Sequence, residues 1–188
     1  MIKSKVAAII GLIFLTLNQL LLLRGNEFIQ TQGFDYTHWL LLIGVLLALS
    51  INYVFSNALF NNLATVLTSL GVVALIGQAA IDFLWWSYGT DYEGMNQLTG
   101  QIMSKPSIRI PFITLGPALF YLGLAIHAGR FIKKHALWAM ISILGVIVTG
   151  LGSFYFDSRM IILLGHIVLT LGISVLILKI PNPNQNDF

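Results

Sequence analysis

The chain has 188 residues, of which 57% are hydrophobic and only 9% are charged. An ordinary soluble domain carries about 25% charged residues, so this chain has too little polar surface to be covered by water. Its apolar residues come in blocks close to the roughly 20 residues that a helix needs to cross a bilayer. Uninterrupted apolar runs exclude membrane barrel strands, which alternate polar and apolar residues. The sequence therefore predicts an all-α integral membrane protein.

Charge and cysteine content exclude several classes of function. The formal net charge of +3 comes mostly from lysines and arginines that flank the apolar blocks. No basic stripe with interleaved aromatic residues occurs, so the charge indicates membrane orientation and not nucleic-acid binding. Cysteine is absent, which excludes disulfides, thiolate metal sites and cysteine nucleophiles.

The first apolar block covers residues 6–23 and follows Lys3 and Lys5, as in a secretory signal peptide. It is longer than the roughly 7 to 15 residues of a signal-peptide core, and Arg24 and Gly25 follow it instead of a small-residue cleavage site. We therefore interpret it as the first membrane span.

Five more spans follow along the chain. The spans are predicted at about 6–23, 38–55, 63–86, 110–132, 136–156 and 160–178. They form a single transmembrane domain over residues 1–180, and a flexible polar tail follows at 181–188. A short turn joins the second and third spans, which predicts that they are antiparallel neighbours. That turn is rich in asparagine, with Ser56, Asn57, Asn61 and Asn62.

The longest segment outside the spans lies between Ser87 and Arg109. It follows a cluster of aromatic residues typical of a headgroup boundary, which are Phe83, Trp85, Trp86 and Tyr88. Met95, Leu98 and Ile102 within it have helical spacing, so a short surface helix is predicted there.

Six spans place both termini on one side of the membrane. The positive charges on that side are Lys3, Lys5, Arg130, Lys133, Lys134 and Lys179. Those on the other side are Arg24, Lys105, Arg109 and Arg159. The group at 130–134 lies in a short loop, where the positive-inside rule is most reliable, so we place it in the cytoplasm. The chain is thus predicted to be a multi-pass protein of the cell membrane with cytoplasmic termini.

Polar side chains inside the spans are the candidate functional residues, because burying one without a partner costs roughly a few kcal/mol. At about 1.5 Å of rise per residue, Asn18, Asp82 and His166 lie at similar depths below the outer surface. Gln78 shares a helix face with Asp82, and Thr170 shares one with His166.

This layer predicts an outward-facing polar pocket in which Asp82 and His166 are partners, with Asn18, Gln78 and Thr170 around them. The segment from Met95 to Ile102 is predicted to cover it. The same residues also have a structural interpretation. Asp82 is about one turn from the aromatic boundary, His166 fits a satisfied core histidine, and Asn18 and Gln78 fit hydrogen bonds between helices.

Two further features concern helix packing in this layer. Pro117 follows Gly116 and predicts a kink or break in the fourth span, and interrupted helices often line binding sites. Gly145, Thr149 and Ser153 form a small-residue stripe on the fifth span, which predicts close approach of a neighbouring helix.

Haem is the cofactor that the histidines could hold. His127 and His166 differ in depth by about 16 Å, too far to share one iron. The pairs of His38 with His166 and of His127 with His135 pass this test, but His38 and His135 lie at helix ends. We therefore predict neither haem, another cofactor nor a metal.

Three functions remain open. The preferred one is a binding or transport component with a polar pocket for a small or amphipathic solute. The second is a structural subunit that packs against other membrane subunits or copies of itself, which predicts no cavity. The third is a membrane enzyme acting on a lipid-like substrate, which predicts a cavity open sideways to the bilayer. No hydrolase, zinc or phosphate-loop motif occurs, so no catalytic residue is assigned and an enzyme is not favoured.

Overall fold

The structure is a computed structural model that describes residues 1–55 and 59–181. These residues form helices and no strands. Six helices are long and apolar enough to cross a membrane, which confirms the prediction of an all-α, multi-spanning bundle. They are Ile2–Leu22, Tyr36–Val54, Asn62–Ser87, Pro106–Gly129, Ile132–Phe154 and Arg159–Lys179.

These helices overlie the predicted spans but begin earlier, by up to four residues at Ile2, Pro106 and Ile132. Hydropathy marks the part of a helix that lies in hydrocarbon, whereas the helix itself continues through polar residues such as Lys3 and Lys5. Of the predicted tail the structure describes only Pro181; residues 182–188, and 56–58 of the asparagine-rich turn, lie outside the described residues.

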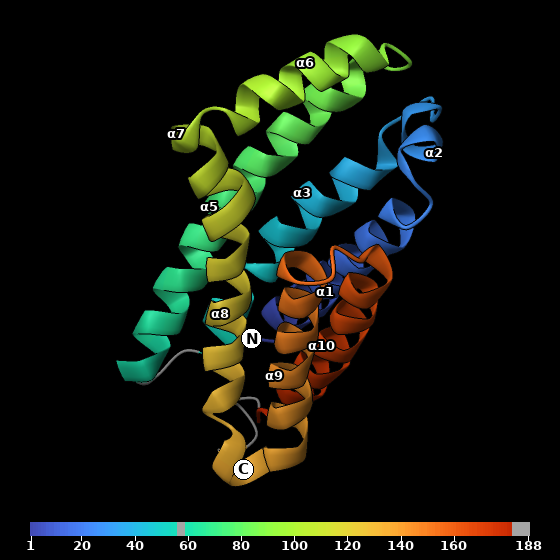
Figure 1. Cartoon of the computed structure of the whole chain (residues 1–188). Coiled ribbons are helices and arrows are strands. Elements are labelled where there is room, and N and C mark those ends of the chain that lie inside the picture. The colour runs from blue at the N-terminus through green and yellow to red at the C-terminus, as the bar shows by residue number, and fades with distance from the viewer. Residues whose placement is uncertain (56–58, 182–188) are drawn as a thin grey trace.

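The membrane helices carry the labels of Figure 1. They are α1 (Ile2–Leu22), α3 (Tyr36–Ala48) with its continuation α4 (Ile51–Val54), α5 (Leu59–Ser87), α8 (Gly116–Gly129), α9 (Ile132–Phe154) and α10 (Arg159–Lys179). Two short elements precede α8, namely α7 (Pro106–Ile108) and the π-helix η1 (Arg109–Leu115). Two helices lie between the spans, namely α2 (Asn26–Gln30) and α6 (Tyr92–Met103).

The six spans form a closed ring. Each membrane helix packs against the next one in the chain, and α10 packs against α1. One end of the ring, here called the distal end, carries α2, α6 and the turn between α9 and α10 (Figure 1). The other end, the terminal end, carries the starts of α1 and α9 and the ends of α8 and α10. Lys5 Nζ donates a hydrogen bond to the Ile180 carbonyl there and ties the first helix to the last.

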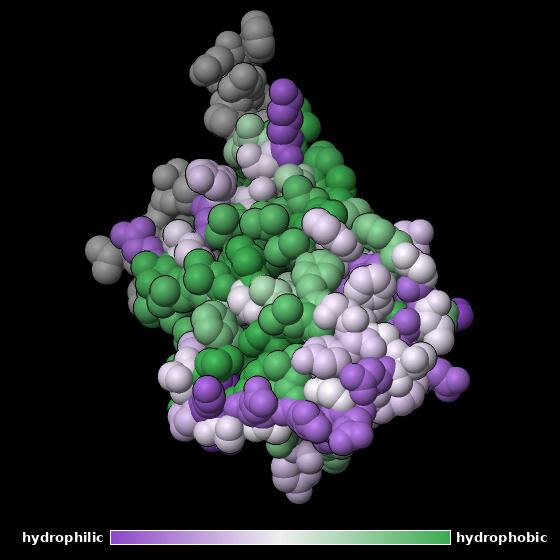
Figure 2. Space-filling model, turned by 90° about the horizontal axis from the view of Figure 1, so that it is seen from above, coloured by the Kyte–Doolittle hydropathy of each residue, from purple (hydrophilic) through white to green (hydrophobic). Residues whose placement is uncertain are grey.

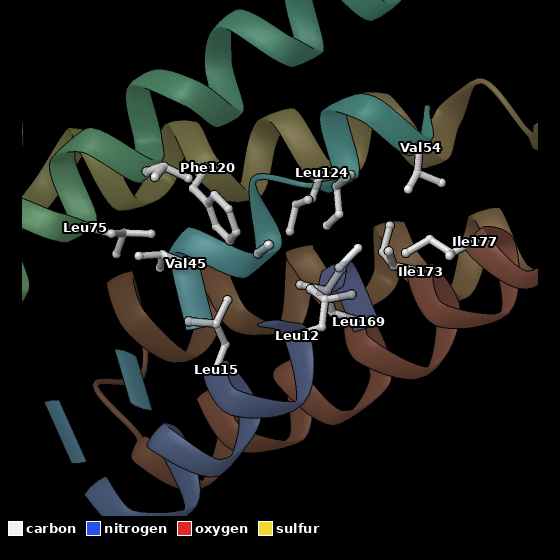
Figure 3. Close-up of a cluster of buried hydrophobic side chains, with 14 of the residues drawn as sticks. Leu12, Leu15, Val45, Val54, Leu75, Phe120, Leu124, Leu169, Ile173 and Ile177 are labelled. Carbon is white, nitrogen blue, oxygen red and sulfur yellow. The ribbon is translucent and has the colours of Figure 1, made fainter. Parts of the chain in front are cut away.

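A hydrophobic core fills the terminal half of the ring. Figure 3 shows side chains from α1, α3, α4, α5, α8 and α10 meeting there. The most deeply buried include Leu12, Val45, Phe120, Leu124 and Ile173. This core closes the bundle on the terminal side of the site described below.

Small residues bring neighbouring helices close together. This is expected in a membrane, because the hydrophobic effect does not drive helices together in lipid and close van der Waals packing has to do so instead. A Cβ on Gly11 would lie 2.4 Å from the backbone nitrogen of Ala48, so α1 and α3 touch through their backbones. On α9, Gly145 packs against Leu169 of α10, and Thr149 packs against Gly165. Gly145 and Thr149 of the small-residue stripe are therefore packing residues, as predicted.

A polar cluster bridges α4, α5 and α8 in the terminal half. Asn52 Oδ1 accepts a hydrogen bond from Thr68 Oγ1 at 2.6 Å and contacts His127 Nε2 at 3.0 Å. Asn52 Nδ2 donates to Ser69 Oγ at 3.3 Å. These bonds satisfy polar groups that lipid cannot solvate, and they join three helices beside the break between α3 and α4.

The predicted surface helix is confirmed as α6, which lies across the distal end (Figure 1). Asp91 begins it by accepting a hydrogen bond from the Gly94 nitrogen at 3.0 Å, and Met95 is its buried anchor. Trp85 Nε1 donates to Thr99 Oγ1 at 2.8 Å and holds α6 to the end of α5. Figure 2 shows hydrophobic side chains across the middle of the surface seen from above and hydrophilic ones along its lower and right-hand edges.

The predicted orientation can be tested by thiol labelling, because the chain has no cysteine of its own. Ser104 and Lys134 are both exposed and lie at opposite ends of the bundle. Ser104→Cys should react with a membrane-impermeant maleimide on intact cells, and Lys134→Cys should react only after permeabilisation. The reverse pattern would place the termini and the site on the opposite sides.

Candidate functional site

The distal half of the ring contains a cavity of about 440 Å³. All six membrane helices line it. Its polar lining residues are Asn18, Gln19, His38, Gln78, Asp82, Tyr121, Thr149, Ser153, Arg159 and His166. The rest of the wall is largely aliphatic, including Leu41, Leu75, Ile113 and Val146. The site is therefore an amphipathic chamber above a closed core.

A second cavity of about 130 Å³ lies next to the first. Residues of α2 and the indoles of Trp85 and Trp86 line it, so it lies nearer the distal end. Both cavities are lined by Leu22, His38, Gln78, Asp82 and Arg159. The four polar residues of this shared set, His38, Gln78, Asp82 and Arg159, are called the polar collar below.

Four of the five predicted site residues line the larger cavity, namely Asn18, Gln78, Asp82 and His166. Thr170 does not line it. Its hydroxyl lies 2.8 Å from that of Thr16 and 3.3 Å from the carbonyl of Leu12, which fixes α10 against α1. The structure thus brings four of the predicted residues to one cavity. Thr170, the deepest of the five, is part of a contact between helices instead.

His166 pairs with Tyr121 and not with Asp82, the partner expected from the sequence. The Tyr121 hydroxyl lies 2.8 Å from His166 Nε2, and the two rings meet edge to face with centroids 5.4 Å apart. Buried polar groups generally find such partners, and this bond spans the bundle from α8 to α10. Tyr121 follows Pro117 by one helical turn, so its position on the same face was a usable signal in the sequence.

Asn18 also has a mainly structural set of bonds. Its amide nitrogen donates to the Thr37 carbonyl at 2.9 Å, and its amide oxygen accepts from Gln19 Nε2 at 2.9 Å. The side chain is buried and joins the end of α1 to the start of α3. Its contribution to the cavity wall is therefore to hold two helices in place.

An Asp–His pair that the sequence analysis did not single out lies at the start of α3. Asp35 and His38 are 2% and 5% exposed, and Asp35 Oδ2 lies 2.7 Å from His38 Nδ1. Asp35 Oδ1 also accepts a hydrogen bond from the His38 backbone nitrogen at 3.1 Å, so it begins the helix and orients the ring. The signal was an aspartate three residues before a histidine at a helix start.

The other members of the polar collar retain unused hydrogen-bonding capacity. Within residues 1–55 and 59–181, Gln78, Asp82 and Arg159 form no side-chain hydrogen bond or ion pair. His38 uses Nδ1 for Asp35, which leaves Nε2 as its ring nitrogen without a partner in the described structure. Arg159 lies at the start of α10 on the same face as Ile162 and His166. From the sequence, Arg159 was expected only to be one of the flanking charges that indicate orientation.

The larger cavity reaches the lipid-facing surface between α8 and α9. Leu122 of α8 is 48% exposed and Phe154 of α9 is 65% exposed, and both line the cavity. Val146 and Gly150 line the same side. The two helices run side by side from the turn that joins them at the terminal end (Figure 1). Because the outer faces of these helices lie in hydrocarbon, this opening leads sideways into the bilayer.

The irregularity expected at Pro117 lies in the turn before it. Proline lacks a backbone N–H and its ring crowds the carbonyl four residues earlier, at Ile113. The chain accommodates this with the π-helix η1, after which α8 begins at Gly116 with Pro117 in its first turn. Ile113 and Pro117 both line the cavity, so the widened turn forms part of its wall.

The predicted cover lies beside the site and does not close the larger cavity. No residue of α6 lines either cavity. Met95 instead accepts a hydrogen bond from Gln30 Nε2 at its sulfur, 2.9 Å away, and Gln30 of α2 lines the smaller cavity. The end of the site is therefore formed by α2, which α6 supports from outside.

The histidines that passed the depth test for haem have protein partners. His38 and His166 line the same cavity. One ring nitrogen of His38 bonds Asp35, and one ring nitrogen of His166 bonds Tyr121. His127 Nε2 bonds Asn52, and the His135 ring stacks on Phe131. No group of three or more histidine, aspartate or glutamate side chains able to hold a metal occurs in the part of the chain that the structure describes.

Comparisons of the chain with models of protein families, with curated proteins and with solved structures find no match. The geometry of the two cavities is therefore the evidence for function.

The Tyr121–His166 bond gives a test of how the cavity wall is held. Tyr121→Phe leaves a buried histidine nitrogen without its partner, which should lower stability by about 1 to 3 kcal/mol. The measurement is the thermal unfolding of the purified protein in detergent. Tyr155→Phe is the control, since Tyr155 is exposed and should tolerate the change. Equal melting temperatures for both variants would contradict a structural role for the bond.

Proposed function

We propose that this multi-spanning membrane protein binds a small amphipathic molecule in the cavity of its distal half. The observation that carries the proposal is the combination of an aliphatic chamber with a polar collar whose groups have unused hydrogen-bonding capacity. An apolar body fits the chamber, and a polar head fits between His38, Gln78, Asp82 and Arg159. Such sparse, convergent polar groups in an apolar pocket are typical of small-molecule sites.

The size and closure of the cavity support binding. About 440 Å³ lies within the roughly 300 to 1,000 Å³ of ligand pockets. The hydrophobic core below it blocks passage to the terminal end, so the described structure has a dead-end chamber and not an open pore. A purely structural subunit gives no reason to keep an unpaired carboxylate beside such a chamber, because intramembrane charge is costly.

The lateral opening indicates how the ligand arrives. A molecule dissolved in the bilayer can pass between α8 and α9 and place its apolar part in the chamber without crossing water. With the predicted orientation, the polar head then lies near the outer surface of the cell membrane. A transport role would require the distal and terminal ends to open in turn, and binding is the step that the cavity supports directly.

Ligand-dependent stabilisation tests this proposal. The wild-type protein in nanodiscs should gain thermal stability from one class of amphiphile in a panel of lipids and small solutes, because a ligand that binds only the folded state stabilises it. Asp82→Asn should abolish most of that gain without lowering stability in the absence of ligand. Asp157→Asn is the matched control, since Asp157 is an exposed carboxylate that lines neither cavity. A panel in which no compound stabilises the wild type would contradict the proposal.

Acid–base chemistry on a lipid-like substrate is a second candidate, favoured by the Asp35–His38 pair. A carboxylate bonded to Nδ1 holds the imidazole in one orientation and leaves Nε2 to accept a proton from a bound molecule. The lateral opening is the feature expected of an enzyme whose substrate comes from the bilayer.

Lipid analysis separates this candidate from binding alone. Wild-type protein in nanodiscs of total cellular lipid should convert one lipid to a product detected by mass spectrometry, and His38→Gln should not. An unchanged lipid profile with the wild type would contradict catalysis and leave the binding proposal intact.

A further inference from the structure

Two opposite charges of the polar collar line the same space without pairing. Asp82 extends from α5 and Arg159 from α10, and both line the larger and the smaller cavity. In the described part of the chain neither Asp82 nor Arg159 forms an ion pair, and the short contact of Asp35 with His38 involves neither of them. A carboxylate and a guanidinium that share a cavity but remain apart leave room for a group between them.

We propose that the head of the bound molecule is zwitterionic, with an ammonium group at Asp82 and a phosphate or carboxylate at Arg159. This inference rests on the proposed function and names the class of its ligand. Arginine presents a planar fork of donors that matches phosphate and carboxylate oxygens. Asp82 and Arg159 carry opposite formal charges, so a head with one positive and one negative group matches them best.

The collar further selects a primary ammonium. Three side chains that line both cavities can accept hydrogen bonds from such a head, namely the Asp82 carboxylate, the Gln78 amide oxygen and His38 Nε2. His38 can accept there because Nδ1 donates its hydrogen to Asp35, which leaves the lone pair on Nε2. A primary ammonium has three N–H donors to match these acceptors, whereas a quaternary ammonium has none.

The chamber supplies the rest of the recognition. Aliphatic side chains such as Leu41, Leu75 and Val146 line the space that continues from the collar toward α9. A single hydrocarbon chain fits there, and any remaining length can leave between α8 and α9 into the bilayer. The ligand class is therefore an amphiphile with a hydrocarbon chain and a compact ammonium-containing zwitterionic head.

A headgroup series with one fixed tail tests this inference. Single-chain amphiphiles with a phosphoethanolamine, phosphocholine, phosphate, amine, amino-acid or glucoside head are titrated into wild-type protein in nanodiscs, and binding is measured by microscale thermophoresis. The phosphoethanolamine or the amino-acid head should bind about tenfold more tightly than phosphate, amine or phosphocholine, because each charge-assisted contact contributes about one decade of affinity. Comparison of these two heads shows whether the anion is phosphate or carboxylate.

Charge variants assign each contact. Asp82→Asn and Arg159→Gln should each weaken binding of the zwitterion about tenfold. Asp82→Asn should leave the affinity for the phosphate amphiphile unchanged. Arg159→Gln should leave the affinity for the amine amphiphile unchanged. Arg109→Gln, at an exposed arginine outside both cavities, is the control. If either variant does not fold, the wild-type headgroup order alone decides.

Two outcomes would overturn the inference, and they differ in what they leave standing. Equal affinity for the glucoside and the zwitterions would show an uncharged recognition mode and keep the proposed binding function. Absence of binding by every amphiphile in the series would overturn the zwitterion and the proposed function together.

Discussion

The structure depends on one constraint, which is that lipid cannot satisfy a polar group. In the terminal half the ring largely meets this constraint with an aliphatic core and the Asn52 cluster, whose members bond one another, and only His127 Nδ1 and Ser174 Oγ are buried there without a partner among the described residues. In the distal half the polar groups of the layer divide into two sets. Tyr121 and His166 satisfy each other, whereas Gln78, Asp82 and Arg159 retain unused capacity in the described structure. That division is the basis of the functional argument.

The cavity follows from how the helices pack. Small residues bring α1 to α3 and α9 to α10 at backbone contact, and the ring closes through α10 and α1. The chamber lies between the distal halves of these helices, with the π-helix η1 in its wall, and it reaches exposed side chains of α8 and α9. A π-helix is less stable than an α-helix and often marks a functional site. Pro117 fixes its position at this depth.

The helices and the depth of the polar layer could be predicted from the sequence, because apolar length and helical rise depend only on local composition. Four predicted residues therefore line one cavity, as expected, namely Asn18, Gln78, Asp82 and His166. Thr170 did not, since the rotation of α10 turns its hydroxyl toward Thr16. The Tyr121–His166 bond and the role of Arg159 depend on which helices are neighbours in the ring, and helix lengths and depths alone do not give that order. Asp35 was overlooked because it lies just outside the apolar span.

The central claim is that the cavity binds an amphiphile. The most direct test is to ask whether the purified wild-type protein carries such a molecule, and whether a variant whose cavity is filled by a larger side chain has lost it. Gly150 lines the cavity, and a Cβ there would meet no atom within 4 Å, so Gly150→Phe should occupy the chamber without disturbing the helices. Native mass spectrometry of protein released from membranes should show a bound small amphiphile on the wild type and its loss in Gly150→Phe at unchanged thermal stability. The same adduct on both proteins, or on neither, would contradict binding in this cavity.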